Sequence, residues 1–444
     1  MAKRTAFGKL HIWMNGELVG LWEQTPRGPV WQYFDEWLQS ERARPLSLSL
    51  PFTPDNQPYR DAKVTAFFDN LLPDSDAIRL RLAQQYQTTS TSPFELLAKI
   101  GRDCAGAIQL LPVDEDPTGL FQIFGTPLNP KEIAQILRDA TSSRAFGNTG
   151  LDRALRLSIA GAQEKTALLF HDEQWMLPTG STPTTHIFKL PLGIIGNMKA
   201  DMRTSVENEW LCSKILHAYD IPIAHCEMAQ FEDQKALVVT RFDRKLSTDA
   251  SWIIRLPQED FCQATGTPPT LKYQSDGGPG TAQIMEILLG SNQAQQDRLH
   301  FYKTQIIFWV LAATDGHAKN FSIAHLPQNQ YQATPIYDVL SAHPIIGRSK
   351  NQIALQDAKL AMAVHSKNNH YEIDKILHRH WLTQAEQVQL GADAATDLIE
   401  DIVRSTPQVI NSVSKLLPKD FPVDVADSIF TGMQRQIQKL ARVV

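Results

Sequence analysis

The chain has 444 residues, with 43 Lys and Arg against 48 Asp and Glu, which gives a formal net charge of −5. Hydrophobic residues make up 43% and charged residues 20%, which excludes a mainly disordered chain, and the slightly acidic balance argues against a protein that wraps nucleic acid by itself. At roughly 100–200 residues per domain, this length predicts two to four domains or one large domain with lobes.

The cysteines and the longest apolar run indicate the cellular compartment of the protein and whether it spans a membrane. Four cysteines lie far apart without a CxxC or Cys-His pair, so the sequence predicts neither a zinc site nor a disulfide framework and favours a reducing cytoplasm. The longest strongly apolar run, residues 306–313, is far short of the ~20 residues that span a bilayer. We therefore expect no membrane segment.

The first elements in chain order are a β-hairpin and a mixed segment. Asn15-Gly16 lies between alternating apolar runs, which predicts a type I′ hairpin turn. Residues 60–112 look mixed or helical, and polar and glycine-containing stretches place the main boundary between 115 and 150.

Short strands dominate the next stretch, and helices dominate the last. The period-2 and period-3.6 patterns predict strands at 155–159, 166–170, 175–177, 186–191, 223–229 and 236–240, and helices at 205–219, 281–290, 296–313 and most of 383–442. A β-rich lobe with one helix, followed by a helical lobe, is the element order of a bilobal kinase.

Residues 314–320 are the most informative for chemistry. Asp315 and Asn320 are five apart, which suits a loop better than one face of a helix. In kinases, an Asp accepts the substrate hydroxyl proton and an Asn five residues later binds Mg²⁺. Asp338 follows a short β-like run and could be the second metal ligand. The alternative is an ordinary turn after a helix at Asp315-Gly316 and a cap at Asp338.

Lys189 lies on an apolar strand, where a buried ammonium needs a partner. In kinases this lysine contacts the ATP phosphates, and a helix glutamate orients it. Glu209, within the expected helix 205–219, is the candidate, with Glu207 as a competitor. The alternatives are an edge strand whose lysine reaches water and a solvated helix face for Glu209.

Residues 158–165, SIAGAQEK, lie between two expected strands, where a phosphate-covering loop belongs. Small residues at 160–162 permit backbone N–H groups to approach phosphate oxygens, and Lys165 could add charge. The loop lacks GxGxxG and GxxxxGK[ST], so spacing alone favours a plain hairpin connection. His365, His370, His378 and His380 are too loosely spaced for a metal site and are expected on the surface.

Strings along nearly the whole chain closely resemble the HipA toxin family. They are ARPLSLSLP (43–51), FFDNLLPD (67–74), IGRDCAGAI (100–108), SIAGAQEKTAL (158–168), TPTTHIFKLP (182–191), RFDRK (241–245), LPQEDFCQ (256–263), KYQSDGGPG (272–280) and ATDGHAKNFS (313–322). The resemblance implies an α+β, bilobal, phosphoinositide-kinase-like fold. It also implies an N-terminal α/β subdomain at 1–115, a β-rich ATP lobe at 150–245 and a helical C-terminal lobe at 246–444.

The resemblance further implies a serine/threonine protein kinase that uses ATP and Mg²⁺. Asp315 would be the catalytic base, Asn320 and Asp338 the metal ligands, and Lys189 a phosphate contact. Ser158 would be autophosphorylated in trans, which would inactivate the kinase. The other nucleotide contacts implied are the loop residues Ala160, Gly161, Ala162, Gln163, Glu164 and Lys165, the hinge and ribose residues Thr240, Phe242 and Asp243, and His317 and Lys319.

The family also implies partners. Its known target is glutamyl-tRNA synthetase, and its antitoxin is the helix-turn-helix protein HipB, which carries most of the operator DNA contacts in operon repression. Two alternatives stay open: a small-molecule kinase, since the position of His317 is also similar to that in aminoglycoside-type kinases, and a non-catalytic corepressor that acts with a DNA-binding antitoxin.

Overall fold

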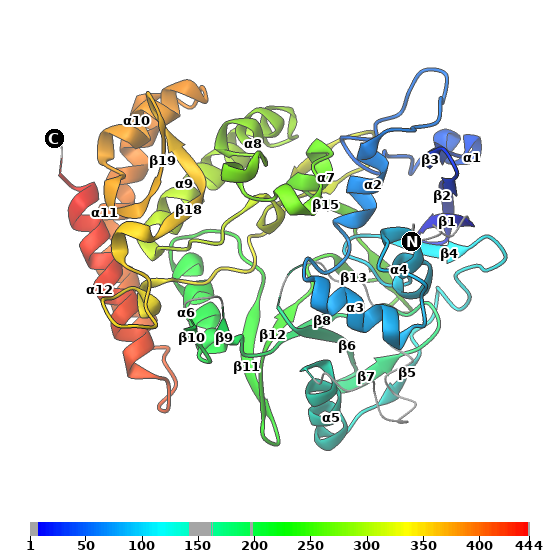
Figure 1. Ribbon diagram of the computed structural model, residues 1–444, viewed down its shortest axis with the longest axis horizontal. Helices are drawn as coiled ribbons and strands as arrows, with labels where there is room; N and C mark the ends of the chain where they lie inside the picture. Colours follow the sequence, from blue (N-terminus) through cyan, green and yellow to red (C-terminus); the bar gives the residue numbers. More distant parts are fainter. Residues whose placement is uncertain (1–7, 142–160, 162, 196–198, 443–444) are drawn as a thin grey trace. The chain divides into compact units, whose positions relative to one another are not determined.

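The computed structural model describes residues 8–141, 161, 163–195 and 199–442 (Figure 1). The chain forms two compact units, each assembled from separate stretches of sequence. The first unit contains residues up to 190, 229–271 and 323–331, and the second contains 191–228, 272–322 and the residues from 332 onward. These units do not coincide with the three segments expected from sequence, and that division stays a prediction.

The first unit opens with a four-stranded antiparallel sheet in the order β3-β2-β1-β4. The turn between the first two strands has positive φ at both Asn15 (47°) and Gly16 (88°), which confirms the expected hairpin. Four helices accompany the sheet. The elements are β1 (Gly8–Met14), β2 (Glu17–Thr25), β3 (Gly28–Tyr33), β4 (Ile108–Pro112), α1 (Asp35–Gln39), α2 (Ala62–Asp69), α3 (Asp76–Gln85) and α4 (Pro93–Ile100).

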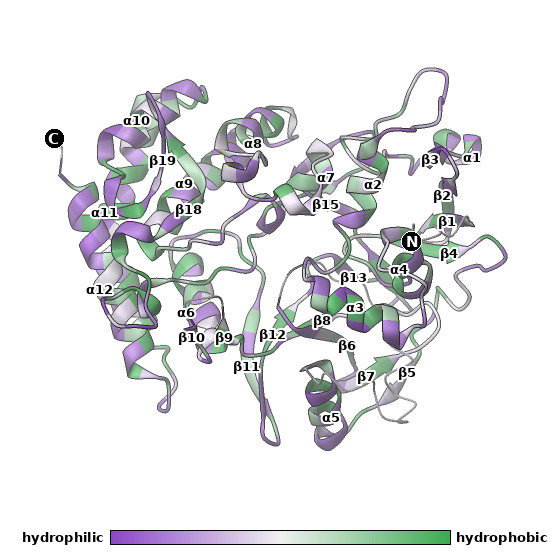
Figure 2. Cartoon of the chain, viewed as in Figure 1, coloured by the Kyte–Doolittle hydropathy of each residue, from purple (hydrophilic) through white to green (hydrophobic). Residues whose placement is uncertain are grey.

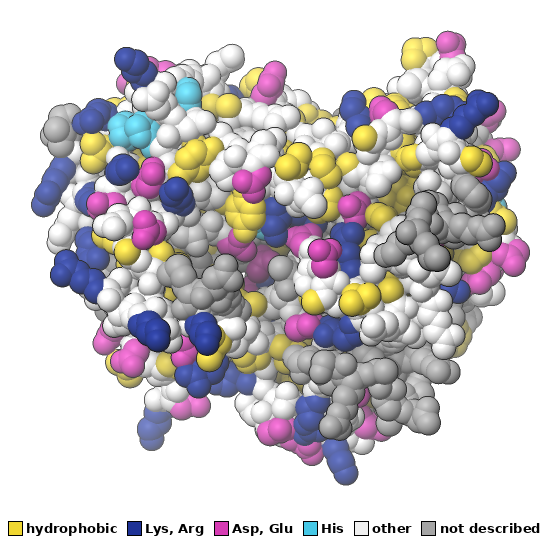
Figure 3. Space-filling view, viewed as in Figure 1, with side chains coloured by type: hydrophobic (Ala, Val, Ile, Leu, Met, Phe, Trp, Pro, Cys, Tyr) yellow, Lys and Arg dark blue, Asp and Glu magenta, His cyan; other side chains and the backbone are white. Residues whose placement is uncertain are grey.

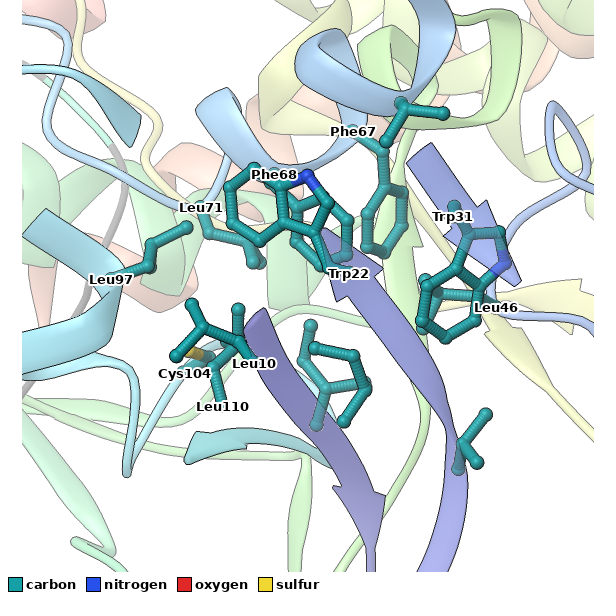
Figure 4. Packing of buried hydrophobic residues seen from close by; sticks show 14 of the residues in the cluster. Leu10, Trp22, Trp31, Leu46, Phe67, Phe68, Leu71, Leu97, Cys104 and Leu110 are labelled. Atoms are coloured by element: carbon teal, nitrogen blue, oxygen red, sulfur yellow. The ribbon is translucent and has the colours of Figure 1, made fainter. Parts of the chain in front are cut away.

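Aromatic and aliphatic side chains together form the core that packs on this sheet. Trp22 of β2 stacks on Phe68 of α2 with ring centroids 3.9 Å apart (Figure 4). Phe94 of α4 meets Trp22 edge-on. Burying one such large side chain stabilises the fold by about 1.5–3 kcal/mol, so this cluster holds the helix α2, whose end carries the start of the string FFDNLLPD, against the sheet.

A six-stranded sheet follows, in the order β11-β12-β8-β6-β7-β5. The strands expected at 166–170, 175–177, 186–191 and 236–240 are confirmed, whereas the one at 155–159 lies outside the described residues. The helix α5 packs against β6 and β12. The elements are β5 (Gly125–Pro127), α5 (Pro130–Thr141), β6 (Lys165–His171), β7 (Gln174–Pro178), β8 (His186–Lys189), β11 (Cys226–Phe231) and β12 (Gln234–Thr240).

A buried ionic cluster joins distant parts of the first unit. Asp103 accepts hydrogen bonds from the backbone N–H and hydroxyl of Thr184, at 2.9 and 2.7 Å, and from Arg244 at 2.8 Å. Burial alone would raise the pKa of Asp103, but the nearby arginines outweigh it and hold this pKa well below its usual range. The cluster contains Asp103, Asp243, Arg241, Arg244 and Arg255.

A second junction surrounds the helix α7 (Phe261–Thr265), which Asp260 caps in a capping box with Gln263. The carbonyl of Gln263 accepts hydrogen bonds from the hydroxyls of Ser47 (3.1 Å) and Ser49 (2.7 Å). Glu259 accepts from the N–H of Leu48 at 2.8 Å. The strings SLSLP and LPQEDFCQ therefore make structural contacts with each other. Nearby elements are β13 (Arg244–Leu246), β14 (Ile253–Arg255), β15 (Gln258–Asp260) and η1 (Pro269–Leu271).

The second unit is largely helical around the buried helix α9 (Ala294–Leu311). The helices α11 and α12 carry both hydrophobic and hydrophilic residues, and their buried residues recur at helical spacing, as expected for helices with one face on a core (Figure 2). The other helices are α6 (Ser205–Ala218), η2 (Gln274–Asp276), α8 (Thr281–Ile287), η3 (Leu288–Gly290), η4 (Ala318–Asn320), η5 (His343–Ile345), η6 (Leu355–Asp357), η7 (Ile373–Lys375), α10 (His378–Gln387), α11 (Ala392–Ser414) and α12 (Val423–Leu440).

Strands also occur after residue 280, where the sequence pattern predicts mostly helices. The strands β16 and β17, which form a sheet with β15, and the hairpin β18-β19 were not expected there. The fold is thus a mixed α+β fold, as predicted. The remaining strands are β9 (Gly193–Ile195), β10 (Ala200–Met202), β16 (Ser322–His325), β17 (Tyr331–Ala333), β18 (Lys359–His365) and β19 (Asn369–Glu372).

One expectation about the histidines is wrong. His380 is only 7% exposed, and its ring stacks on that of His370 with centroids 3.9 Å apart. The described residues include no group of three or more His, Cys, Asp or Glu side chains that could hold a metal ion.

The face of the molecule shown in Figure 3 carries charged side chains of both signs. Figure 3 shows basic and acidic side chains interspersed on the face in view rather than gathered by sign. No helix in the described part of the chain is both long enough and apolar enough to cross a membrane.

Candidate functional site

Lys189 is the last residue of β8, which lies between β12 and β6 in the sheet. It pairs with Leu237 on one side and Lys165 on the other, and it is 6% exposed. The edge-strand alternative is therefore wrong, because both neighbours of β8 are present and the side chain does not reach open solvent. A lysine held this way suits a charged ligand or partner rather than water.

Four residues of the expected phosphate loop, Ser158, Ile159, Ala160 and Ala162, lie outside the described residues. Gly161 has φ = 112°, which strongly favours glycine, and its carbonyl accepts a hydrogen bond from the N–H of Asp74 at 3.0 Å. A Cβ at this position would lie 2.5 Å from Nζ of Lys165. The backbone of Gly161 therefore passes directly beside the Lys165 ammonium.

Gln163 and Glu164 connect this segment to the rest of the first unit. The side-chain amide of Gln163 donates to the carbonyl of Leu190 at 2.6 Å. Glu164 forms a two-pronged ion pair with Arg81 of α3, at 2.9 and 2.5 Å. The arginine offsets a carboxylate that would otherwise repel phosphate, which reduces the electrostatic cost of having Glu164 in a phosphate loop.

The expected hinge residues follow β12. Thr240 pairs with His186, and both Thr240 and Phe242 are half-buried. Asp243 is 5% exposed and accepts hydrogen bonds from Arg241 at 2.8 Å and from the N–H of Gly106 at 2.7 Å. Burial raises the pKa of Asp243, but Arg241 and Arg244 lower it further, so the net shift is downward. These contacts give Asp243 a structural role here, and its ribose contact stays a prediction.

The loop that carries Asp315 lies in the second unit, directly after α9. Ala312 ends the helix with φ = 50°, and the N–H of Ala313 donates to the carbonyl of Phe308 at 2.7 Å. A Cβ at position 316 would lie 2.4 Å from the ring of Phe308, so only glycine permits this close packing. The Asp315 side chain is 58% exposed and thus accessible to a substrate.

Asn320 is brought back onto the start of this loop. Its side-chain amide donates to the backbone carbonyl of Asp315 at 2.7 Å, and it is 4% exposed. Because the Nδ2 group is used in this bond, the oxygen Oδ1 is the atom that it presents to a ligand. The five-residue spacing therefore does place the two side chains on one short loop.

Tyr337, the residue before Asp338, is hydrogen-bonded to the loop that contains Asn320. The Tyr337 hydroxyl donates to the carbonyl of Lys319 at 2.9 Å and lies 2.5 Å from the hydroxyl of Ser322. Asp338 itself has φ = 63°, an unfavourable conformation for a residue with a side chain. Such strain clusters at functional sites, where surrounding contacts enforce it. Asp338 thus follows a residue bonded to the Asn320 segment.

The helix α6 is fixed to the segment that follows Asp338. Asn208 and Ser341 exchange two hydrogen bonds, at 2.8 and 2.9 Å. The next residue, Glu209, is 4% exposed, so the solvated-face alternative is wrong. Glu207 is equally buried, at 3%, and it remains a competitor for orienting a lysine.

His317 and Lys319 are also buried within this loop, at 4% and 6% exposed. Nε2 of His317 lies 3.9 Å from Oδ1 of Asp315. Sequence reasoning missed Tyr273, whose hydroxyl donates a short hydrogen bond to Oδ1 of Asp315. Tyr273 belongs to the string KYQSDGGPG, but nothing in the sequence pattern assigned a function to this tyrosine.

The donor set of the second unit suits magnesium bound together with a nucleotide. Mg²⁺ usually keeps several waters and takes one or two carboxylates plus substrate phosphates, rather than a cage made of protein alone. The carboxylate of Asp338 and the amide oxygen of Asn320 match that requirement. The candidate phosphate-binding lysine, Lys189, belongs to the first unit, and the candidate base and metal ligands belong to the second.

Known proteins resemble the chain over almost its whole length. The HipA N-terminal domain family matches residues 10–111, and the HipA-like C-terminal domain family matches residues 157–410. The Sinorhizobium fredii protein Y4mE, provisionally named a kinase, is 34% identical, with 91% of each chain covered. The serine/threonine-protein kinase toxin HipA of Shewanella oneidensis is 25% identical, with 92% of this chain and 89% of that one covered.

A solved structure agrees in fold. A chain in the Shewanella oneidensis complex of HipA, HipB and operator DNA superposes with a TM-score of 0.78 at 21% identity, covering 97% of this chain and 96% of that one. The C-terminal match alone spans more than half of the sequence. The chain belongs to the HipA family.

Proposed function

We propose that the chain is the toxin kinase of a toxin–antitoxin system, which transfers the γ-phosphoryl group of Mg-ATP to a serine or threonine of a protein. A pair of hydrogen bonds supports this: Asn320 donates to the Asp315 carbonyl, and Tyr337, the residue before Asp338, donates to the Lys319 carbonyl. The kinase names of the relatives support the same chemistry.

The chain's own residues divide the reaction between them. Lys189 would bind the phosphate oxygens, and Asn320 and Asp338 would hold Mg²⁺, which would supply neutralising charge. Asp315 orients the acceptor hydroxyl and takes its proton as the oxygen bonds to the γ-phosphorus. The bond from that phosphorus to the bridging oxygen breaks, and ADP leaves with the electron pair.

The protein substrate, the autophosphorylation site and the antitoxin are proposed from the resemblance to the HipA family. We infer glutamyl-tRNA synthetase as the protein substrate, Ser158 as the site of inactivating autophosphorylation, and a HipB-like antitoxin that carries operator DNA contacts in repression of the operon. The solved complex of the Shewanella oneidensis proteins contains HipB and operator DNA, which supports this partner. We expect these events in the cytoplasm.

The test is phosphoproteomics after expressing the wild type, Asp315→Gln and a control, Asp357→Asn. Asp357 is an exposed residue of η6 outside the candidate site. We expect new phosphoserines with the wild type and the control and none with Asp315→Gln. Equal labelling by Asp315→Gln would refute the assignment of the base.

Two other outcomes would favour the alternative functions. Labelling of a metabolite instead of a protein would favour a small-molecule kinase. Repression of the operon without any ATP binding would favour the non-catalytic corepressor.

A further inference from the structure

A tyrosine outside the usual kinase set contacts the candidate base. The Tyr273 hydroxyl donates to Oδ1 of Asp315, and its ring meets that of His317 edge-on with centroids 5.1 Å apart. Both contacts lie within the second unit. Tyr273 comes 42 residues before Asp315, so a local turn does not explain the pairing.

The neighbours of Tyr273 hold it in place. The carbonyl of Lys272 accepts a hydrogen bond from the N–H of Ala318 at 3.3 Å, and the Lys272 ammonium lies 5.6 Å from the Tyr273 ring. On the other side, Gln274 accepts from the N–H of Ala363 at 2.8 Å. These bonds fix the chain on both sides of Tyr273 and so hold its backbone beside the loop of Asp315.

The hydrogen bond from Tyr273 matters because it restrains the side chain of Asp315, which is largely exposed. Its side chain is 58% exposed, so an isolated carboxylate there would sample several rotamers. The bond to Oδ1 selects one of them and leaves Oδ2 to accept the proton of an incoming hydroxyl. A base must lie within hydrogen-bond reach of that proton, so fixing its rotamer raises the fraction of productive encounters.

We propose that Tyr273 is a positioning residue, which holds the Asp315 carboxylate in the orientation needed to accept the substrate proton. This rests on the proposed kinase function. The tyrosine acts through Asp315, which has no role in nucleotide binding under the proposed function. Its loss should therefore slow the transfer step without weakening nucleotide binding.

The test is Tyr273→Phe, which keeps the ring against His317 and removes only the hydroxyl. The assay measures ADP released from Mg-ATP by the full chain, with water as the acceptor, so it requires no knowledge of the protein substrate. The matched control is Tyr371→Phe, on β19 outside the site. We expect kcat to fall roughly tenfold to hundredfold, the scale of a hydrogen bond to a charged group. KM for ATP and the melting temperature should match the wild type.

Each result decides the question. A fall in kcat alone, absent from Tyr371→Phe, supports positioning. An unchanged kcat, or a fall that comes with a raised KM or a lowered melting temperature, overturns it in favour of no role or a general structural one. If the wild type itself releases no ADP, both the proposed kinase function and the inference about Tyr273 are refuted. If the wild type and Tyr273→Phe release ADP equally fast, only the inference about Tyr273 is refuted.

Discussion

Replacing Asp103 by Asn tests whether the buried ionic cluster holds the first unit together. The cluster has three arginines and two aspartates, an excess of one positive charge, and the substitution raises the excess to two. Asparagine has nearly the shape of aspartate, so the change isolates the charge. Its amide group would face Arg244, which now donates to Asp103 at 2.8 Å.

The expected loss is large because the group is buried. Asp103 is 7% exposed, and removing one partner of a buried ion pair costs about 3–5 kcal/mol, since the remaining charges stay desolvated. Native proteins are stable by only about 5–15 kcal/mol, so this is roughly a fifth or more of the total. Loss of the cluster would loosen the strings IGRDCAGAI and RFDRK together.

Urea unfolding at neutral pH, followed by tryptophan fluorescence, measures the change, because Trp22 and Trp31 lie in the core of the same unit. The matched control is Asp116→Asn, an exposed aspartate of the same unit, which should change stability by no more than about 0.5 kcal/mol. A loss below about 1 kcal/mol for Asp103→Asn would refute the reasoning.

The sign of the pH dependence follows from the same residues. Asp103 and Asp243 have pKa values lowered in the folded state, so their contribution to stability is present above the unfolded pKa of about 3.9 and is lost as the pH falls below it. The Asp103→Asn variant should therefore lose less stability than the wild type between pH 5 and pH 3. An equal loss in both proteins would contradict this.

Two further predictions concern Lys189 and His380. Lys189→Met, which keeps an unbranched apolar chain, should lower ADP release by about 100-fold or more because the phosphates lose their ammonium, while Lys359→Met, an exposed lysine of β18, should not. Burial, with help from His370 and Arg379, lowers the pKa of His380 to about 4, below its unfolded value of about 6.5, so stability should decline as the pH falls from 6.5 toward 4.5. His380→Phe keeps a ring against His370 and should flatten that decline in urea midpoints; an unchanged slope would show that His380 does not cause it.

The sequence alone determined the local features. The Asn15-Gly16 turn follows from residues that tolerate positive φ, and the helices 205–219 and 296–313 follow from apolar periodicity. Lys189 on an apolar strand already indicated a buried charge, because an ammonium is costly there without a partner. The spacing of Asp315 and Asn320 indicated a loop, and the structure bonds the two residues within one.

Only the tertiary structure decided contacts between residues far apart in sequence. The bond from Tyr273 to Asp315, the exchange between Asn208 and Ser341, and the pairing of Asp103 with Arg244 span 42, 133 and 141 residues. No periodicity or local propensity encodes such pairs, because each depends on where the intervening chain folds. Such contacts explain part of two strings that identified the family, because charged residues of IGRDCAGAI and RFDRK are buried partners of one another.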